Sequence, residues 1–222
     1  MHWRLSRSLL KNSQLRGWIA LAFVMHPGWA QVESSRVLNI SREFPIPESE
    51  EQYRKIEEDA ARICAELKCP NPYIGIESLT GPKEAWWING FASMDARTRV
   101  GEQYASNRQL TDALNRITER KRDLVADSTE VVAIYRKDLS HGPRWEVGQG
   151  RFLVITITRD KPAGEGTVFE TADGTRFVIR GERDAGEAES KAKDGAQIFA
   201  VRPYWSMPAK EWITADPEFW KR

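Results

Sequence analysis

Histidine and cysteine, the residue types that most often bind metals or activate a nucleophile, are scarce in this chain, which has three of the first and two of the second. His2 and His26 lie in an N-terminal segment that we expect to be removed, which leaves only His141. Zinc sites built on several histidines are therefore excluded, and a Ser-His-Asp arrangement would have to use His141. That residue stands in a Gly- and Pro-containing loop, where histidines are usually solvated. We expect no metal site and no cofactor.

Cys64 and Cys69 are the only cysteines. An even pair in an oxidising compartment favours a disulfide. Five residues apart on one unbroken helix they would be too distant to bridge. Pro70 disfavours helical backbone at Cys69, so we expect the helix to end near Lys68, where a bridge can pin the helix end. Two free buried thiols are the alternative that the spacing leaves open.

Trp86 and Trp87 are the aromatic pair to which we attach a functional hypothesis. They are adjacent on a predicted strand and therefore face opposite sides of its sheet. One of them faces the helices, and the other needs a cover. Both can be core residues, as tryptophans usually are. Alternatively, one lines a ligand cavity or a subunit interface, where aromatic side chains are enriched.

The first half of the chain predicts an alternation of strands and helices. Apolar alternation and Pro or Gly punctuation predict strands, and apolar residues at steps of three and four predict helices. The predicted order is strand 37–44, helix 48–68, strands 73–79 and 84–91, a helical segment 93–125, and strand 129–136. This is the order of the split βαβ, or ferredoxin-like, fold. Such a sheet has helices on one face only, so its other face needs a second copy or the chain's own second half.

The second half predicts a smaller β-rich unit. The Gly- and Pro-rich stretch 141–149 is the best internal boundary. After it come a strong strand at 152–158, a hairpin around Asp173-Gly174, a weak helix at 185–194 and a strand at 196–204. The C-terminus is rich in aromatic residues, including Trp205, Trp212, Phe219 and Trp220. Disordered segments have few aromatic residues, so we expect this tail to pack on the body of the protein in short turns.

Residues 1–30 have the composition of a secretory signal peptide. They carry Arg4, Arg7, Lys11 and Arg16 but no acidic residue, followed by a nine-residue apolar run over 17–25 and a small-x-small triplet ending at Ala30. The run is too short to span a bilayer, so we expect no stable membrane span. A mitochondrial presequence is the alternative. We expect cleavage after Ala30 and export to the periplasm or the medium.

The charge of the remaining chain argues against nucleic acid as a partner. The full sequence has 33 basic and 32 acidic side chains, and cleavage removes four basic ones, which leaves 29 against 32 and a net charge of −3. Such a chain has no overall attraction to nucleic acid or to anionic membranes.

The segment 37–137 resembles the dimeric α+β barrel superfamily, to which NIPSNAP-type and antibiotic-biosynthesis-monooxygenase-type domains belong. The resemblance rests on the element order, on the residues AWWINGFASM at 85–94, and on YASNRQL at 104–110, which looks like a break those domains show inside the second helix. It implies a homodimer closed by two sheets and a cavity between sheet and helices. The candidates for lining such a cavity are Trp86, Trp87, Asn89 and Tyr104.

These observations predict an α+β protein with a ferredoxin-like domain at 31–140, a linker at 141–149 and a β-rich domain with an aromatic tail at 150–222. The leading hypothesis is an exported, non-catalytic module that binds a small apolar ligand or a partner protein, because no nucleophile–base pair can be placed. The alternative is a cofactor-free oxygenase or isomerase that works inside the cavity. A structural protein of the cell envelope is a third interpretation.

Overall fold

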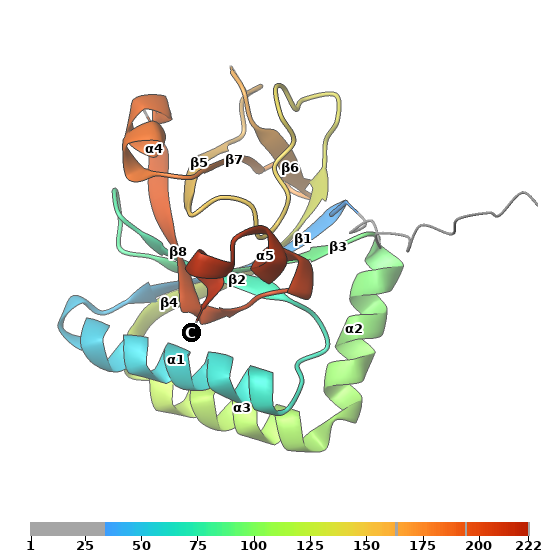
Figure 1. Cartoon of the computed structure of the whole chain (residues 1–222), viewed down its shortest axis with the longest axis vertical. Coiled ribbons are helices and arrows are strands. Elements are labelled where there is room, and N and C mark those ends of the chain that lie inside the picture. The colour runs from blue at the N-terminus through green and yellow to red at the C-terminus, as the bar shows by residue number, and fades with distance from the viewer. Residues whose placement is uncertain (1–33, 163, 194, 222) are drawn as a thin grey trace, which may run out of the picture. The chain divides into compact units, whose positions relative to one another are not determined.

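The computed structural model describes residues 34–162, 164–193 and 195–221, so the predicted signal peptide lies outside the described residues. Figure 1 shows the elements along the chain. The strands are β1 (Val37–Pro45), β2 (Tyr73–Ser78), β3 (Ala85–Phe91), β4 (Val125–Tyr135), β5 (Phe152–Thr158), β6 (Thr167–Thr171), β7 (Arg176–Glu182) and β8 (Ala196–Met207). The helices are η1 (Pro47–Ser49), α1 (Glu50–Glu66), α2 (Met94–Ser106), α3 (Arg108–Lys121), α4 (Ala185–Lys191), α5 (Lys210–Ala215) and α6 (Pro217–Trp220). None of the described helices is long and apolar enough to cross a membrane.

The eight strands form one closed antiparallel barrel in the order β1-β3-β2-β8-β5-β7-β6-β4. The expected α+β class is confirmed, but the expected succession of two units is replaced by a single sheet. Strands before and after residues 141–149 pair directly, β2 with β8 and β4 with β6. Closure removes the free edges that a separate four-stranded sheet would expose.

Both halves of the barrel place their four strands in the same neighbour order. In the first half it is β4-β1-β3-β2, and in the second it is β8-β5-β7-β6. The halves differ in their helices, because no helix is described between β5 and β6, whereas α1 connects β1 to β2. The sheet face that we expected a second copy or the second half to cover therefore meets the chain's own second half.

Alternation along β3 sends Trp86 into the barrel and Trp87 toward the helices. Trp86 has no exposed surface and packs among Phe177 and Phe199 from the second half, with ring centroids 5.9 and 4.8 Å away. Its indole N–H donates to the buried Glu84 carboxylate at 2.7 Å, which satisfies the polar end of the ring. Trp86 is thus a core residue of the barrel.

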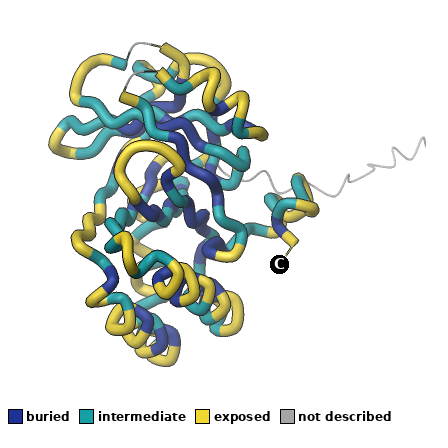
Figure 2. Tube along the Cα trace, turned by 90° about the vertical axis from the view of Figure 1, so that its left-hand side faces the viewer, coloured by how far each residue is buried: buried dark blue, intermediate teal, exposed yellow. Residues whose placement is uncertain are grey.

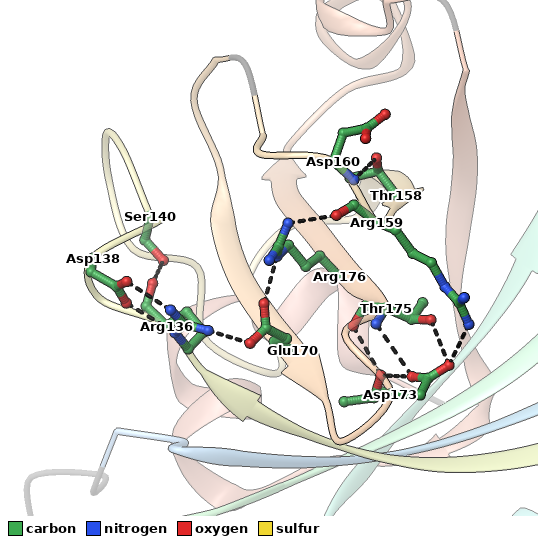
Figure 3. A network of polar contacts seen from close by, with 11 residues as sticks. Arg136, Asp138, Ser140, Thr158, Arg159, Asp160, Glu170, Asp173, Thr175 and Arg176 are labelled. Atoms are coloured by element: carbon green, nitrogen blue, oxygen red, sulfur yellow. Dashed lines mark hydrogen bonds and ion pairs between the residues drawn. The ribbon is translucent and has the colours of Figure 1, made fainter.

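One join between the halves lies where β4 meets β6, and three residue pairs form its register. Figure 3 shows the polar network around it. Glu170 on β6 accepts from Arg136, which follows β4, and from Arg176 on β7 at 2.5 Å. Asp173 lies in the hairpin turn and accepts from Thr175. Charged pairs therefore supplement a short strand pairing.

Helices α1 and α3 lie side by side across the outer face of the first half (Figure 1). Each buries an apolar stripe, whereas no residue of α2 is buried. The break between α2 and α3 falls at Asn107, inside the segment 104–110 where we expected it, and the Asn107 side chain accepts from the Leu110 N–H at 3.1 Å. Figure 2 shows buried positions gathered along the strands and exposed ones on the outer turns of the helices.

Helix α1 ends early enough for its two cysteines to meet. Lys68 adopts a left-handed backbone conformation with φ of 57°, which turns the chain back, and the Cys69 N–H donates to the Cys64 carbonyl at 2.8 Å. The two sulfur atoms are joined in a disulfide, with the Cα atoms 4.8 Å apart.

The aromatic tail divides between two cores. Trp205 belongs to β8, which runs three residues beyond the expected end, and it packs edge-on against Tyr53 of α1 at 6.2 Å. Trp220 is buried with the barrel core, and Trp212 lies 6.0 Å from it. The spacing of seven and eight residues between the three tryptophans would bring them to one side only on continuous helical turns, and Trp205 is instead in a strand. The expectation of short turns holds for α5 and α6.

Candidate functional site

A cavity of about 710 Å³ lies between the outer face of the first-half strands and helices α1, α2 and α3. The sheet contributes alternate residues of two neighbouring strands, Asn39, Ser41 and Glu43 from β1 and Trp87, Asn89 and Phe91 from β3, together with Tyr73 from β2 and Glu130 from β4. The helices contribute Glu57, Ala60 and Cys64 from α1, Arg97, Gly101 and Tyr104 from α2, and Leu114, Ile117 and Lys121 from α3. The period of two along each strand explains why these sheet residues share one face.

Helix α2 forms the outer wall of the cavity without being packed onto the sheet. Ser93 caps it by accepting from the Ala96 N–H at 3.1 Å. Its contact with β1 is polar, because the Arg97 guanidinium donates to the Asn39 side-chain oxygen at 2.9 and 3.0 Å, while Tyr104 at its other end packs against the apolar cluster around Cys64. Asn39 in turn donates to Glu130 at 3.0 Å. A helix attached to the sheet by polar contacts leaves space beneath it.

Three of the four residues that we expected to line a cavity do so, namely Trp87, Asn89 and Tyr104. Trp86 does not, because strand alternation turns it into the barrel interior. Asn89 donates to the Pro72 carbonyl at 3.4 Å. Burial raises the pKa of Tyr104 to about 12, so its hydroxyl stays protonated at neutral pH.

One end of the cavity holds charged side chains that our sequence analysis did not single out. The Lys121 ammonium of α3 lies 2.7 Å from the Glu57 carboxylate of α1. The same ammonium donates to both carboxylate oxygens of Glu43 on β1 at 2.7 and 2.9 Å. It also stands over the ring of Trp87, 4.8 Å from the ring centre. One cation is thus shared by two carboxylates and an aromatic face.

Both charged helix residues occupy positions in apolar stripes, and this was the signal in the sequence. Glu57 is four residues after Tyr53 and three before Ala60, and Lys121 is four residues after Ile117. Residues at these spacings lie on the same face of a helix. Burying a charge within a core-facing stripe costs free energy unless the charge is paired, so each of these positions indicated a paired side chain without indicating its partner.

Burial dominates the electrostatics of Glu57, whose side chain is 3% exposed. Desolvation raises the pKa of Glu57 to about 7, the Lys121 charge opposes this rise and the Glu43 charge adds to it. Burial disfavours the charged form of Lys121, but the carboxylates of Glu57 and Glu43 outweigh it and raise the pKa of Lys121 above its usual value. Glu57 therefore changes protonation near neutral pH while Lys121 stays charged.

Tyr53 of α1 is the fourth polar side chain of this cluster. Its hydroxyl donates to Glu43 at 2.7 Å. Burial, with the nearby carboxylates of Glu57 and Glu43, raises the pKa of Tyr53 well above its usual value. Tyr53 thus remains a hydrogen-bond donor that holds Glu43 in place, and Glu43 holds Lys121.

The other sequence candidates lie away from this cavity or at its edge. His141 lies in the connection between β4 and β5. It is exposed and forms an isolated β-bridge with Gly166. Cys64, which forms the disulfide with Cys69, lines the cavity. Over the described ranges, no group of three His, Cys, Asp or Glu residues is arranged to hold a metal ion.

The arrangement combines an apolar ring surface with groups that can exchange a proton. Trp87 and Phe91 offer flat apolar faces, Asn89 and Arg97 offer polar contacts, and Glu57 offers a carboxylate that both accepts and releases protons near neutral pH. Such a site can bind a small, partly apolar molecule and can also act on it as an acid or base.

No family model matches this sequence, and no curated protein matches it. Solved structures that resemble it include a NIPSNAP family protein from Agrobacterium tumefaciens, 15% identical, which covers 47% of this chain and 89% of its own with a TM-score of 0.38. A proposed monooxygenase from Fusobacterium nucleatum is 12% identical over 84% of this chain and 88% of its own, with a TM-score of 0.44. Another from Lactobacillus acidophilus is 8% identical over 76% and 93%, with a TM-score of 0.41. The structural neighbours of this chain therefore include both types of protein that its sequence resembles.

Proposed function

We propose that the protein binds a small, flat, partly apolar molecule in the cavity between the first-half sheet and helices α1 to α3. The observation that carries this proposal is the cavity itself, about 710 Å³ in volume, with Trp87 at its base. Ligand pockets in proteins usually measure 300–1,000 Å³ and combine apolar walls with a few polar groups.

The lining indicates what the ligand looks like. Apolar side chains, including Phe91, Leu114 and Ile117, would contact a ring system lying against Trp87. Arg97 and Asn89 would bind a carbonyl or an acidic group at the mouth beside α2. Asn39 and the Pro72 carbonyl already accept from these two side chains, but a purely apolar ligand would exclude water from their remaining polar atoms, which costs free energy. We therefore favour a ring compound with at least one polar substituent.

The polar groups beside Trp87 favour chemistry on the bound molecule over storage alone. An all-apolar lining would have favoured the non-catalytic binding module, which is our leading hypothesis from the sequence. The Lys121 ammonium lies directly over the Trp87 ring, with two carboxylates around it. The proposed function therefore includes the catalytic alternative, a cofactor-free enzyme.

The probe for binding is 1-anilinonaphthalene-8-sulfonate, a fluorescent ring compound with an acidic group. Gly101 lines the cavity on α2, and a Cβ atom added there meets no atom within 4 Å. Gly101→Phe should fill the cavity and weaken probe binding by about tenfold or more, which corresponds to at least 1.4 kcal/mol. Gly101→Ala is the matched control and should bind like the parent. Equal affinity of all three proteins would overturn the proposal.

We also propose that the mature protein is exported, on the basis of the composition of residues 1–30. N-terminal sequencing of the protein isolated from its native host should begin at Gln31 or within a few residues of it. A protein that retains Met1 in the cytosol would contradict export.

A further inference from the structure

We propose that Glu57 is the base of a cofactor-independent proton-transfer reaction, in which an enolisable cyclic ketone bound in the cavity is isomerised. The inference rests on the proposed binding function and assigns to the same site a reaction and a substrate class.

The geometry of Glu57 points to a reactive group more than to a structural ion pair. Its side chain is 3% exposed and lines the cavity from α1. Its only ion-pair partner among the described residues is Lys121, which contacts the Oε1 atom at 2.7 Å, and no hydrogen bond of the described residues engages its Oε2 atom. A buried carboxylate that serves only structure normally has its oxygens satisfied by donors. Here the Oε2 oxygen has no such donor, and the side chain lines the cavity.

The groups around Glu57 hold it ready without neutralising it permanently. Lys121 faces it from α3, Glu43 faces it from β1 across the same ammonium, and Tyr53 lies one turn before it on α1. Lys121 is held in place by Glu43 and by the Trp87 ring, so its charge faces both Glu57 and the cavity from a fixed position. Glu43 is bound by Lys121 and Tyr53, which leaves Glu57 as the less constrained carboxylate of the two.

The reaction requires no oxidant or further reactant. The Glu57 carboxylate takes a proton from a carbon next to the ketone carbonyl, and the electron pair of that C–H bond becomes the C=C bond of an enolate. The negative charge moves to the carbonyl oxygen, where the nearby Lys121 ammonium offsets it. The neutral Glu57 then returns the proton, either to the same carbon or to another carbon of the conjugated system. Return to a different carbon gives an isomer, and return to the same carbon exchanges hydrogen with solvent.

The test follows that exchange with 2-tetralone, an apolar bicyclic ketone with an acidic C–H. Exchange of its C1 hydrogens in D₂O is measured by proton NMR with the full mature chain, and binding is measured separately by displacement of 1-anilinonaphthalene-8-sulfonate. General-base catalysis typically contributes about 10²-fold or more, so we expect acceleration of that order over buffer. Glu57→Gln should return the rate to that of buffer and still bind the fluorescent probe. Glu58→Gln is the matched control, because Glu58 is the exposed neighbour on the same helix, and it should behave like the parent.

A second measurement reads Glu57 directly. Carbon-13 NMR of the glutamate carboxyls, assigned with Glu57→Gln, should show a titration midpoint near 7, and the exchange rate should rise with pH through the same midpoint. Glu43→Gln should move both midpoints to lower pH, because the Glu43 charge disfavours ionised Glu57. If the Glu57–Lys121 pair were purely structural, Glu43→Gln would not change the pH dependence of the exchange rate.

The outcomes separate the two proposals. If the parent protein does not bind the fluorescent probe, the binding function is overturned. Probe binding that 2-tetralone does not displace would overturn the ketone class. Displacement with the same exchange rate in the parent and Glu57→Gln, or a Glu57 midpoint near 4.5, would overturn the role of Glu57 and leave the binding function standing.

Discussion

The Nζ atom of Lys121 on α3 lies 2.7 Å from Oε1 of Glu57 on α1, at the point where both helices face the sheet. These two residues are 12% and 3% exposed, so the pair is buried between the helices and the cavity. It connects α1 to α3 and, through Glu43, connects both to β1. The stability of the helical layer and the proposed chemistry of the cavity therefore depend on the same atoms.

Removal of the shared cation should destabilise the protein strongly. Lys121→Met would leave the Glu57 and Glu43 carboxylates close together without a counter-ion. Breaking a buried pair by removing one partner typically costs about 3–5 kcal/mol. Urea unfolding at pH 7.5 measures the loss. Arg120→Met is the control, because the exposed Arg120–Asp59 pair should contribute less than about 1 kcal/mol. Equal losses for the two variants would mean that the buried cluster contributes no more than a surface pair.

The contribution of Glu57 to stability should depend on pH. Its pKa rises from 4.5 in the unfolded chain to about 7 in the folded protein. The stabilisation of the folded protein that this raised pKa provides is complete below pH 4.5 and is lost as the pH rises through 7. A shift of this size corresponds to roughly 3 kcal/mol.

Glu57→Gln cannot ionise and lacks this component. The difference in unfolding free energy, parent minus variant, should therefore decrease by up to about 3 kcal/mol between pH 4.5 and 8. Urea unfolding at intervals of one pH unit measures it. A difference that stays constant with pH would show that Glu57 keeps an ordinary pKa.

Two glycines should respond in opposite directions to substitution by alanine. A Cβ atom on Gly75 would lie 2.7 Å from the Trp205 Cβ and 2.9 Å from the Trp205 carbonyl oxygen, so β2 and β8 would have to move apart. Overpacking of this kind costs about 1–3 kcal/mol. Gly101→Ala, in open space on α2, should instead stabilise by about 0.5–1 kcal/mol. Thermal melts of both variants test this contrast, and a lower melting temperature for Gly101→Ala would contradict it.

The aromatic tail should be structural. Trp220 is 4% exposed and belongs to the barrel core. Trp220→Ala should lower the unfolding free energy by about 3–5 kcal/mol, as large-to-small core substitutions do. Ile213→Ala on α5 is the control, since Ile213 is 41% exposed, and should change stability by less than about 0.5 kcal/mol. If Trp220→Ala were equally mild, the tail would not be a structural part of the core.

The bridge between Cys64 and Cys69 should survive isolation of the mature protein. The closed loop is short, so the chain-entropy model gives about 2 kcal/mol of stabilisation. Thiol counting on the denatured protein should find no free thiol before reduction and two afterwards. Two free thiols without reduction would rule the bridge out.

Local patterns in the sequence predicted most elements of the first half. The apolar steps from Tyr53 to Leu67 correspond to α1, and the segment 104–110 contains the break at Asn107. The expected strand at 129–136 begins earlier, at Val125, because its polar first residues pair with the end of β1. Such polar, exposed residues carry no apolar alternation, so pairing alone extends the strand.

The sequence by itself determined the strands, the helices, the end of α1 beside Cys69 and the opposite orientations of Trp86 and Trp87, because these depend on contacts within a few residues. Only the tertiary structure decided that Trp87 is the one facing the cavity, that the second half closes the barrel, and that Glu57 meets Lys121. Each of these depends on segments far apart in the chain, such as the pairing of β2 with β8. Periodicity records which face of an element is apolar, but it does not record which other element covers that face.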